Sequence, residues 1–112
     1  MSEKHSRIYT RSGDDGSTGL ANGQRVRKDS SRMEAIGNVD ELNSLIGVLA
    51  AMKIPAETRE IMLEIQHHLF DIGGALATPH TGALPEDAVT ELERTIDRLD
   101  AALPPLTRFI LP

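Results

Sequence analysis

A short segment near the start of the chain gathers glycine, hydroxyl and charged side chains of the kinds that bind phosphate. Residues 9–18 read Tyr-Thr-Arg-Ser-Gly-Asp-Asp-Gly-Ser-Thr. Glycines let backbone amides approach a ligand closely, and successive amides in such a turn form a concave anion site to which hydroxyls add donors. Spacing alone favours a flexible surface turn, and a polyanion site is the alternative that these residue types leave open. The side chains that could neutralise a phosphate chain are Arg11, Arg25, Arg27 and Lys28.

Two carboxylates in the same segment, Asp14 and Asp15, do not suit a bare anion site. They are explained if Mg²⁺ accompanies the phosphates, because Mg²⁺ is bound by carboxylates together with phosphate oxygens. The segment lacks the Gly-x-x-x-x-Gly-Lys-Ser/Thr pattern that follows a strand in P-loop proteins. A phosphate-binding loop in this segment would therefore be of another kind.

The net charge of −5 conceals two parts of opposite sign. Residues 1–32 hold seven Lys/Arg against four Asp/Glu, and residues 33–112 hold five against thirteen. The basic part is short and only Tyr9 offers a stacking face, so we expect no nucleic-acid partner. A small polyanion is the better match for the local positive charge, and a solvated basic arm is the plain alternative.

The composition also excludes several classes of protein. The sequence has no cysteine, which excludes disulfides, thiolate metal sites and cysteine nucleophiles and fits a reducing compartment. No apolar run approaches the roughly 20 residues that a membrane span needs, and residues 1–7 lack the apolar core of a secretory signal. We therefore expect a cytoplasmic protein without membrane association.

After residue 32 the pattern changes to three amphipathic helices joined by short loops, which predicts an antiparallel bundle. Pro55 and Pro85 suit first helical turns, and the turn cluster at 78–82 and the Pro104-Pro105 pair suit helix ends. No strand alternation appears, so the expected class is all-α. We expect one domain over residues 1–112, with a loop segment at 1–32 and helices at 33–112. The apolar stripes run over residues 33 to about 52, 55 to 78 and 85 to 103.

Three helices of this length bury little surface for their size. We expect either a missing fourth helix or cover by other subunits. The apolar segment 106–112 ends in a proline, which suits the entry to a further helix, so we expect a chain cut before its next element.

Three smaller features have plain interpretations. His67 and His68 are adjacent, so on a helix they do not face one metal. Gly37 and Gly47 lie inside the first expected helix, where each costs about 1 kcal/mol relative to alanine. We interpret both glycines as sites of close helix packing.

Four blocks of the sequence, in order, resemble the PduO-type corrinoid adenosyltransferases. Residues 9–20 with Val-Arg-Lys-Asp at 26–29 resemble their N-terminal ATP-binding signature. Glu-Ala-Ile-Gly-Asn-Val-Asp-Glu-Leu-Asn-Ser at 34–44 resembles the first-helix motif, and Ile-Gln-His-His-Leu-Phe-Asp-Ile-Gly-Gly at 65–74 resembles the second. Phe-Ile-Leu-Pro at 109–112 resembles the segment that precedes a Gly-Gly pair. The similarity extends over residues 7–112.

This resemblance implies an enzyme that transfers the 5′-deoxyadenosyl group of ATP to the cobalt of cob(I)alamin, forming adenosylcobalamin and releasing triphosphate. It implies a ferritin-like helical bundle of the cobalamin adenosyltransferase type, preceded by a glycine-rich nucleotide-binding loop. The substrates would be ATP, with Mg²⁺, and a corrinoid. The protein would be a homotrimer that binds ATP between neighbouring subunits.

The resemblance also implies roles for single residues. Asp40 corresponds to a carboxylate that pairs across a subunit interface with an arginine near the active site, although alone it would be an ordinary solvated acid. Phe109 corresponds to an aromatic beside the corrin that helps keep water and the lower axial ligand off cobalt, although alone it would be a core residue. Asp14 and Gly16 would shape the ATP loop. The residues that would line the ATP site are Thr10, Arg11, Ser12, Gly13, Thr18 and Lys28.

The sequence departs from the family at its end. Family members continue with a Gly-Gly turn and a long helix whose arginines contact the triphosphate, whereas this sequence stops at Pro112. We expect the charge of the departing triphosphate to be poorly stabilised without those arginines. Two alternatives stay open: a catalytically inactive fragment that binds ATP or corrinoid, and a plain helical interaction protein.

Overall fold

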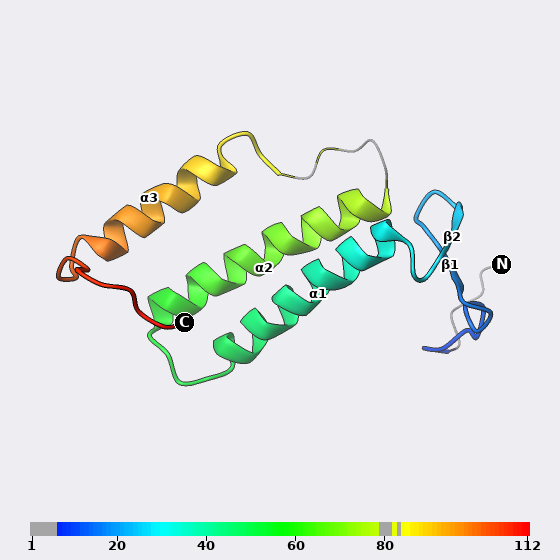
Figure 1. The fold of residues 1–112 in the computed structure, drawn as a ribbon, viewed down its shortest axis with the longest axis horizontal. Coiled ribbons are helices and arrows are strands. Elements are labelled where there is room, and N and C mark those ends of the chain that lie inside the picture. The colour runs from blue at the N-terminus through cyan, green and yellow to red at the C-terminus, as the bar shows by residue number, and fades with distance from the viewer. Residues whose placement is uncertain (1–6, 79–81, 83) are drawn as a thin grey trace.

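The computed structural model describes residues 7–78, 82 and 84–112. A two-stranded sheet of β1 (Ser17–Gly19) and β2 (Arg25–Arg27) precedes three helices. The molecule is elongated, measuring 57 × 29 × 29 Å, with the small sheet at one end (Figure 1). α1 and α2 lie side by side and antiparallel, and α3 runs along the outer side of α2 (Figure 1). The helices are α1 (Ser31–Ala50), α2 (Ala56–Ala77) and α3 (Ala88–Asp100).

The small sheet corrects the expected all-α class, because the described chain is mostly helical with a β-hairpin. Thr18 pairs with Val26 at the centre of the antiparallel ladder. The connection is closed by Leu20, whose amide donates to the carbonyl of Gln24 at 2.8 Å. Strands of three residues are too short to show the alternation by which strands are found in sequences, so the hairpin was missed.

The helices begin and end close to the expected positions. α1 is capped by Ser30, whose Oγ accepts a hydrogen bond from the amide of Met33 at 3.3 Å, a common device for helix N-termini. α2 begins directly after Pro55 and ends at Ala77. Within the turn cluster expected after it, residues 79–81 lie outside the described residues. α3 begins three residues after Pro85.

The α1–α2 hairpin is tied at both ends by arginines that cap the partner helix. Neither helix has a basic residue in its own last turn, where a cation would satisfy free carbonyls and the helix dipole. Arg59 of α2 donates to the carbonyls of Ala50 and Met52 at 2.9 and 2.8 Å. Arg32 of α1 donates to the carbonyl of Leu76 at 2.6 Å. Each helix therefore receives its C-terminal cation from the other.

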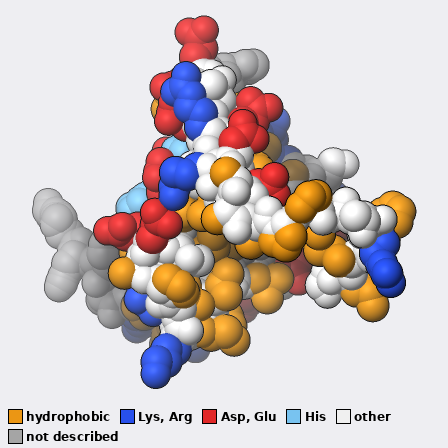
Figure 2. Space-filling model, turned by 90° about the vertical axis from the view of Figure 1, so that its left-hand side faces the viewer, with side chains coloured by type: hydrophobic (Ala, Val, Ile, Leu, Met, Phe, Trp, Pro, Cys, Tyr) orange, Lys and Arg blue, Asp and Glu red, His pale blue; other side chains and the backbone are white. Residues whose placement is uncertain are grey.

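No closed hydrophobic core is present in the described part of the chain. Leu20 alone among the described residues is buried, at 8% exposed, and large apolar side chains are exposed on all three helices, Phe70 at 75%. Figure 2 shows apolar side chains gathered over the middle of one end of the molecule. The expectation that three helices leave their apolar faces uncovered is confirmed.

The α2–α3 pair is held loosely. Arg98 of α3 pairs with Glu57 of α2 at 3.0 Å, and both side chains are largely exposed. A cavity of about 120 Å³ separates the helices near His68 and Glu91. None of the helices in the described ranges combines the length and hydropathy needed to cross a bilayer.

Candidate functional site

The glycine-rich segment forms two overlapping turns ahead of β1. The amide of Asp14 donates to the carbonyl of Arg11 at 3.2 Å, and the amide of Gly16 donates to that of Gly13 at 3.1 Å. Arg11 has φ 65° and Gly16 has φ 92°, a left-handed backbone that glycine adopts without strain and arginine rarely adopts. The chain therefore doubles back here and leads directly into the hairpin.

Lys28 lies against Gly13, fifteen residues earlier in the sequence. A Cβ added at Gly13 would meet Lys28 Nζ at 2.9 Å and the backbone oxygen of Ser17 at 2.8 Å. The backbone of Lys28 is also fixed to the turn, because its amide donates to the carbonyl of Gly16 at 2.9 Å. The hairpin thus brings the lysine ammonium onto the glycine turn, and only glycine leaves room for it there.

Arg25, one of the four cations expected at a phosphate chain, is bonded within the loop itself. Its Nη2 donates to the carbonyl of Ser12 at 2.9 Å and to Ser17 Oγ at 2.6 Å. It therefore ties the turn to β1. The signal that could have placed it is the Arg-Val-Arg alternation around the half-buried Val26, which is the period of a strand.

Arg27 and Asp29 form a bidentate pair next to Lys28. Arg27 Nε lies 2.8 Å from Asp29 Oδ1, and Arg27 Nη2 lies 2.7 Å from Asp29 Oδ2. These hydrogen bonds raise the pKa of Arg27 and lower the pKa of Asp29. The Arg27 guanidinium is thereby paired with a carboxylate, whereas Lys28 and Arg11 have no carboxylate partner among the described residues.

The two carboxylates of the loop have different surroundings. Asp15 Oδ1 accepts hydrogen bonds from the amide of Ser17 at 3.0 Å and from its hydroxyl at 2.8 Å. These bonds hold the pKa of Asp15 below its usual value, against a smaller effect of desolvation. Asp14 has no side-chain hydrogen bond within the described ranges, and it is exposed. Asp15 therefore shapes the turn, and Asp14 is the carboxylate that faces solvent unengaged.

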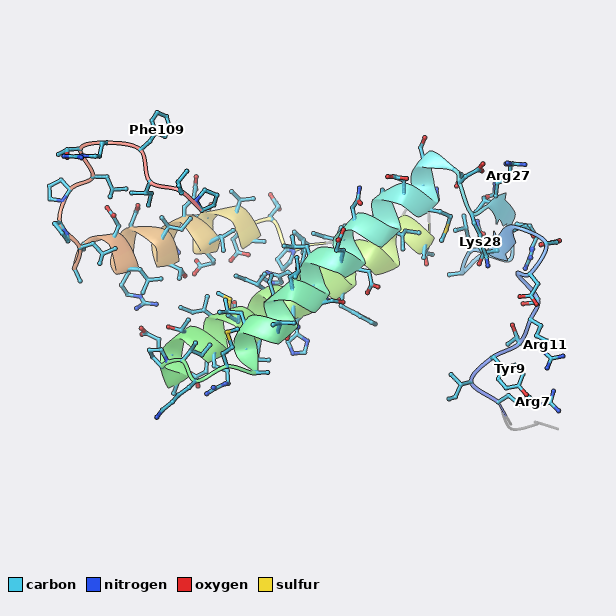
Figure 3. All side chains as sticks on the ribbon, turned by 60° about the horizontal axis from the view of Figure 1, so that its bottom comes forward. Arg7, Tyr9, Arg11, Arg27, Lys28 and Phe109 are labelled. Carbon is cyan, nitrogen blue, oxygen red and sulfur yellow. The ribbon has the colours of Figure 1, made fainter. Side chains whose placement is uncertain are left out.

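Hydroxyls and an aromatic side chain border the same turn. Thr10 Oγ1 lies 2.8 Å from Ser12 Oγ and accepts from the amide of Ser12 at 3.2 Å. Thr18 lies half-buried in β1. The Tyr9 ring lies between two guanidinium groups, 5.8 Å from that of Arg7 and 5.4 Å from that of Arg11 (Figure 3).

Asp40 and Phe109 lie apart from the loop. Asp40 is an exposed residue in the middle of α1. Phe109 is fully exposed, at 102%, in the segment after α3. Figure 3 places Phe109 at the opposite end of the molecule from Lys28 and Arg27. The structure therefore joins Gly13, Gly16 and Lys28 in one turn, whereas Arg11 lies beside Tyr9, away from Lys28 (Figure 3).

Asp40 borders a groove of about 470 Å³ between α1 and α2. Among the residues that the structure describes, a Cβ added at Gly37, Gly73 or Gly74 would meet nothing within 4 Å. Close helix packing is therefore the wrong interpretation of Gly37, which instead hollows the groove. It is correct for Gly47, where an added Cβ would lie 3.1 Å from Gln66 Nε2. The groove is lined by Met33, Ile36, Gly37, Val39, Asp40, Asn43, Leu69, Phe70, Gly73 and Gly74.

The two adjacent histidines occupy different environments on α2. His68 lines the cavity between α2 and α3, whereas His67 is exposed. Within the described ranges, no three or more His, Asp or Glu side chains are grouped to hold a metal ion.

Over nearly all of its length, the chain is similar to a known protein family. Residues 8–112 match the cobalamin adenosyltransferase family. A cobalamin adenosyltransferase of Cupriavidus metallidurans is 48% identical over the whole chain, which spans 61% of that relative. A corrinoid adenosyltransferase of Citrobacter freundii is 42% identical over 95% of the chain, which spans 64% of that relative. The chain thus spans about three fifths of the length of these relatives.

Solved structures agree with these relatives. A variant of the PduO-type ATP:corrinoid adenosyltransferase of Lactobacillus reuteri, complexed with cobalamin and ATP, superposes with a TM-score of 0.84 at 36% identity. The match covers 95% of this chain and 63% of that structure. A second variant of that enzyme, complexed with ATP, gives a TM-score of 0.83 at 39% identity and covers 94% of this chain and 62% of the other.

Proposed function

We propose, since this chain belongs to the cobalamin adenosyltransferase family, that it serves the transfer of the 5′-deoxyadenosyl group of ATP to the cobalt of cob(I)alamin. The products would be adenosylcobalamin and triphosphate. The observation that carries the proposal is the approach of Lys28 Nζ to Gly13 within the glycine turn. This places a compact positive charge beside the backbone amides of a glycine-rich loop, which is an arrangement suited to a phosphate chain.

Different residues of the loop would contact ATP in different ways. Lys28 and Arg11, which have no carboxylate partner among the described residues, supply positive charge to the triphosphate. Thr10, Ser12 and Thr18 supply hydroxyl donors around the turn. The glycine-rich loop is thus proposed as the nucleotide-binding element in front of a ferritin-like bundle.

We propose Asp14 as the loop carboxylate that would hold a magnesium ion. Asp15 is engaged with Ser17, so Asp14 is the carboxylate left to hold Mg²⁺, which needs only one or two protein carboxylates when phosphate and water complete its shell. When bound, the ion would neutralise charge on the phosphate oxygens.

Asp40 and Phe109 require a second copy of the chain to act at the same site. Both are exposed and lie away from the loop of their own chain. We propose a homotrimer in which ATP lies between neighbouring subunits. Asp40 would pair there with an arginine of the neighbour, and Phe109 would pack beside the corrin. The cysteine-free composition supports a cytoplasmic location.

Two measurements test the proposal. Calorimetry with ATP and Mg²⁺ should detect binding, and incubation with cob(I)alamin and ATP under reducing conditions should produce the absorbance spectrum of adenosylcobalamin. Binding without transfer would favour a nucleotide- or corrinoid-binding module. Absence of ATP binding would favour a plain helical interaction protein and would overturn the proposed site.

A further inference from the structure

The two helices of the α1–α2 hairpin are joined at mid-length by a reciprocal pair of side-chain amides. Asn43 Nδ2 donates to the carbonyl oxygen of Gln66 at 3.3 Å, and Gln66 Nε2 donates to the carbonyl oxygen of Asn43 at 3.1 Å. Each carbonyl oxygen has two lone pairs, so it can accept this bond in addition to the bond within its own helix. The pair therefore holds one backbone position of α1 opposite one backbone position of α2.

Gly47 makes room for this contact. A Cβ added there would lie 3.1 Å from Gln66 Nε2, which is closer than ordinary van der Waals contact. Glycine is unfavourable inside a helix, and α1 has one at the position where the Gln66 amide crosses it. Gly47 therefore lowers the helix propensity of α1 but leaves space for the Gln66 amide.

The amide pair and the two arginine ties obey one antiparallel register. From Arg32 to Asn43 and then to Ala50, the bonded position moves eleven and then seven residues towards the end of α1. Its partner on α2 moves ten and then seven residues towards the start of α2, from Leu76 to Gln66 and then to Arg59. The arginine ties at the ends use long side chains whose stems tolerate small shifts, whereas the amides are short and act in both directions. The three ties join Arg32 to Leu76, Asn43 to Gln66, and Ala50 to Arg59.

The amide pair leaves one buried polar atom of the described chain without a hydrogen bond, which lowers stability. Asn43 Oδ1 is buried and has no hydrogen-bond partner in the described part of the chain, and a buried acceptor left unpaired is unfavourable. A leucine at position 43 would fill a similar volume without that cost. Polar side chains kept at such positions in helical assemblies select one register among several apolar packings.

We propose that Asn43 and Gln66 are positioning residues that set the register of α1 against α2 and thereby fix Asp40 across the groove from Phe70. Asp40 precedes Asn43 by three residues on α1, and Phe70 follows Gln66 by four on α2, so each lies one turn from the amide pair. Both border the same groove. The effect on adenosyl transfer rests on the proposed function, whereas the setting of the register does not.

Spin labels measure the register directly, because the chain has no native cysteine. Cysteines at Glu34 on α1 and Asp71 on α2, both exposed, would carry the labels, and an excess of unlabelled chain would suppress distances between copies. We expect one narrow distance in this background and in the control Ser44→Ala, since Ser44 bonds only within α1. The double variant Asn43→Leu/Gln66→Met should give a broader distribution that extends by up to about 5 Å, one helical turn, with its melting temperature unchanged or raised.

An unchanged distribution in the double variant would overturn the proposal. Gly47→Ala keeps it testable if the double variant does not fold, because this change displaces the Gln66 amide without altering either amide residue. A broadened distance in Gly47→Ala would support the proposal, and a distance as narrow as in Ser44→Ala would overturn it.

Comparison of kcat with the KM for ATP shows whether Asn43 and Gln66 position Asp40 or only stabilise the fold. Since the side-chain hydrogen bonds of Asn43 and Gln66 join these two residues and not the nucleotide loop, the double variant of a chain extended to the full length of its relatives should lower kcat by about tenfold or more, as misplaced catalytic groups do, and leave the KM for ATP within about twofold. An unchanged kcat with a broadened distance would overturn the positioning of Asp40. If the unsubstituted chain transfers no adenosyl group, the proposed function fails, and the distance measurement still decides the register.

Discussion

At the residue scale, the loop depends on a contact that tolerates no side chain at one position. A Cβ at Gly13 would be 2.8 Å from the backbone oxygen of Ser17, and that oxygen belongs to β1 and cannot retreat without loosening the hairpin. The lysine on the other side of the turn is the group that the site uses for charge. Predictions at this scale therefore concern Lys28, Asp15 in the same loop, and Asp40 on α1.

Replacement of Lys28 by alanine should weaken ATP binding by about 1–3 kcal/mol, the range for losing a charge-assisted hydrogen bond. The change removes charge beside the glycine turn and leaves the backbone bond from Lys28 to Gly16 in place. Titration calorimetry with ATP and Mg²⁺ measures the effect. Lys53→Ala, an exposed lysine beyond the end of α1, is the matched control. Equal affinities in the two variants would remove the loop from the proposed site.

Acidification should break the hydrogen bonds that Ser17 donates to the Asp15 carboxylate. The hydrogen bonds from Ser17 lower the pKa of Asp15 from 3.8, so the ionised carboxylate stabilises the folded turn. That contribution is complete above the unfolded pKa of about 3.9 and is lost as pH falls through the lowered folded value. The amide resonance of Ser17 should titrate below pH 3.8 and should cease to titrate in Asp15→Asn. A midpoint at or above 3.8 would contradict the hydrogen-bonded geometry.

Asp40→Asn should change the free energy of unfolding by less than about 0.5 kcal/mol, because an exposed side chain without a partner in the described structure contributes little. In a chain extended to the full length of its relatives, the same change should lower adenosyl transfer at least about tenfold, or ~1.4 kcal/mol of transition-state stabilisation. Glu41→Gln, the exposed neighbour, is the control. Equally small effects of both substitutions on transfer would show that Asp40 is an ordinary surface acid.

At the element scale, the α1–α2 hairpin is stabilised by polar ties and opened by glycines. Arginines at the two ends cap the carbonyls of the partner helix, and the amides of Asn43 and Gln66 join the middle. Between the middle and the end tied by Arg32, glycines on both helices leave a groove. The glycines of this hairpin therefore act in two ways: Gly47 allows a close contact with Gln66, and the glycines that line the groove keep it open.

Alanine substitutions distinguish these two kinds of glycine. Gly37→Ala should raise the free energy of unfolding by up to about 1 kcal/mol, the helix propensity gained, because the added Cβ meets nothing within 4 Å. Gly47→Ala should gain less or lose stability, because its Cβ presses on the Gln66 amide at 3.1 Å. Urea unfolding followed by circular dichroism gives both values. Equal gains at the two positions would show that the Gln66 contact is unimportant.

At the scale of the whole molecule, the amount of exposed apolar surface is the dominant feature. Large apolar side chains remain exposed on every helix, and the long axis of 57 Å is about twice either short axis. Soluble monomers seldom expose continuous apolar faces of this kind. The described chain therefore needs further surface to cover α1, α2 and α3.

Self-association follows from this surface, with a trimer as the specific form that we expect. Sedimentation velocity over a range of concentrations should show a species about three times the chain mass, or aggregation where specific assembly fails. A dye that binds apolar surface should bind less as the trimer forms. A monodisperse monomer with cooperative unfolding and no dye binding would contradict the proposed assembly.

The sequence by itself determined the features whose signals are local. Apolar residues at helical spacing, with prolines at 55 and 85, located all three helices to within a few residues. Helix periodicity and caps depend on residues a few positions apart, so one sequence suffices to find them. The same is true of the glycine turn, whose composition marked it before its conformation was known.

The tertiary structure alone decided which distant atoms meet. It formed the β-hairpin, assigned Arg27 to Asp29 and Arg25 to the turn, and left Lys28 on Gly13. It also separated Gly37, which faces open space, from Gly47, which faces an amide. Four basic residues look alike in a sequence, and so do two helical glycines. Arg27 finds its partner Asp29 two residues away, whereas the partners of Arg25, Lys28 and Gly47 lie eight or more residues away, and only folding brings those into contact.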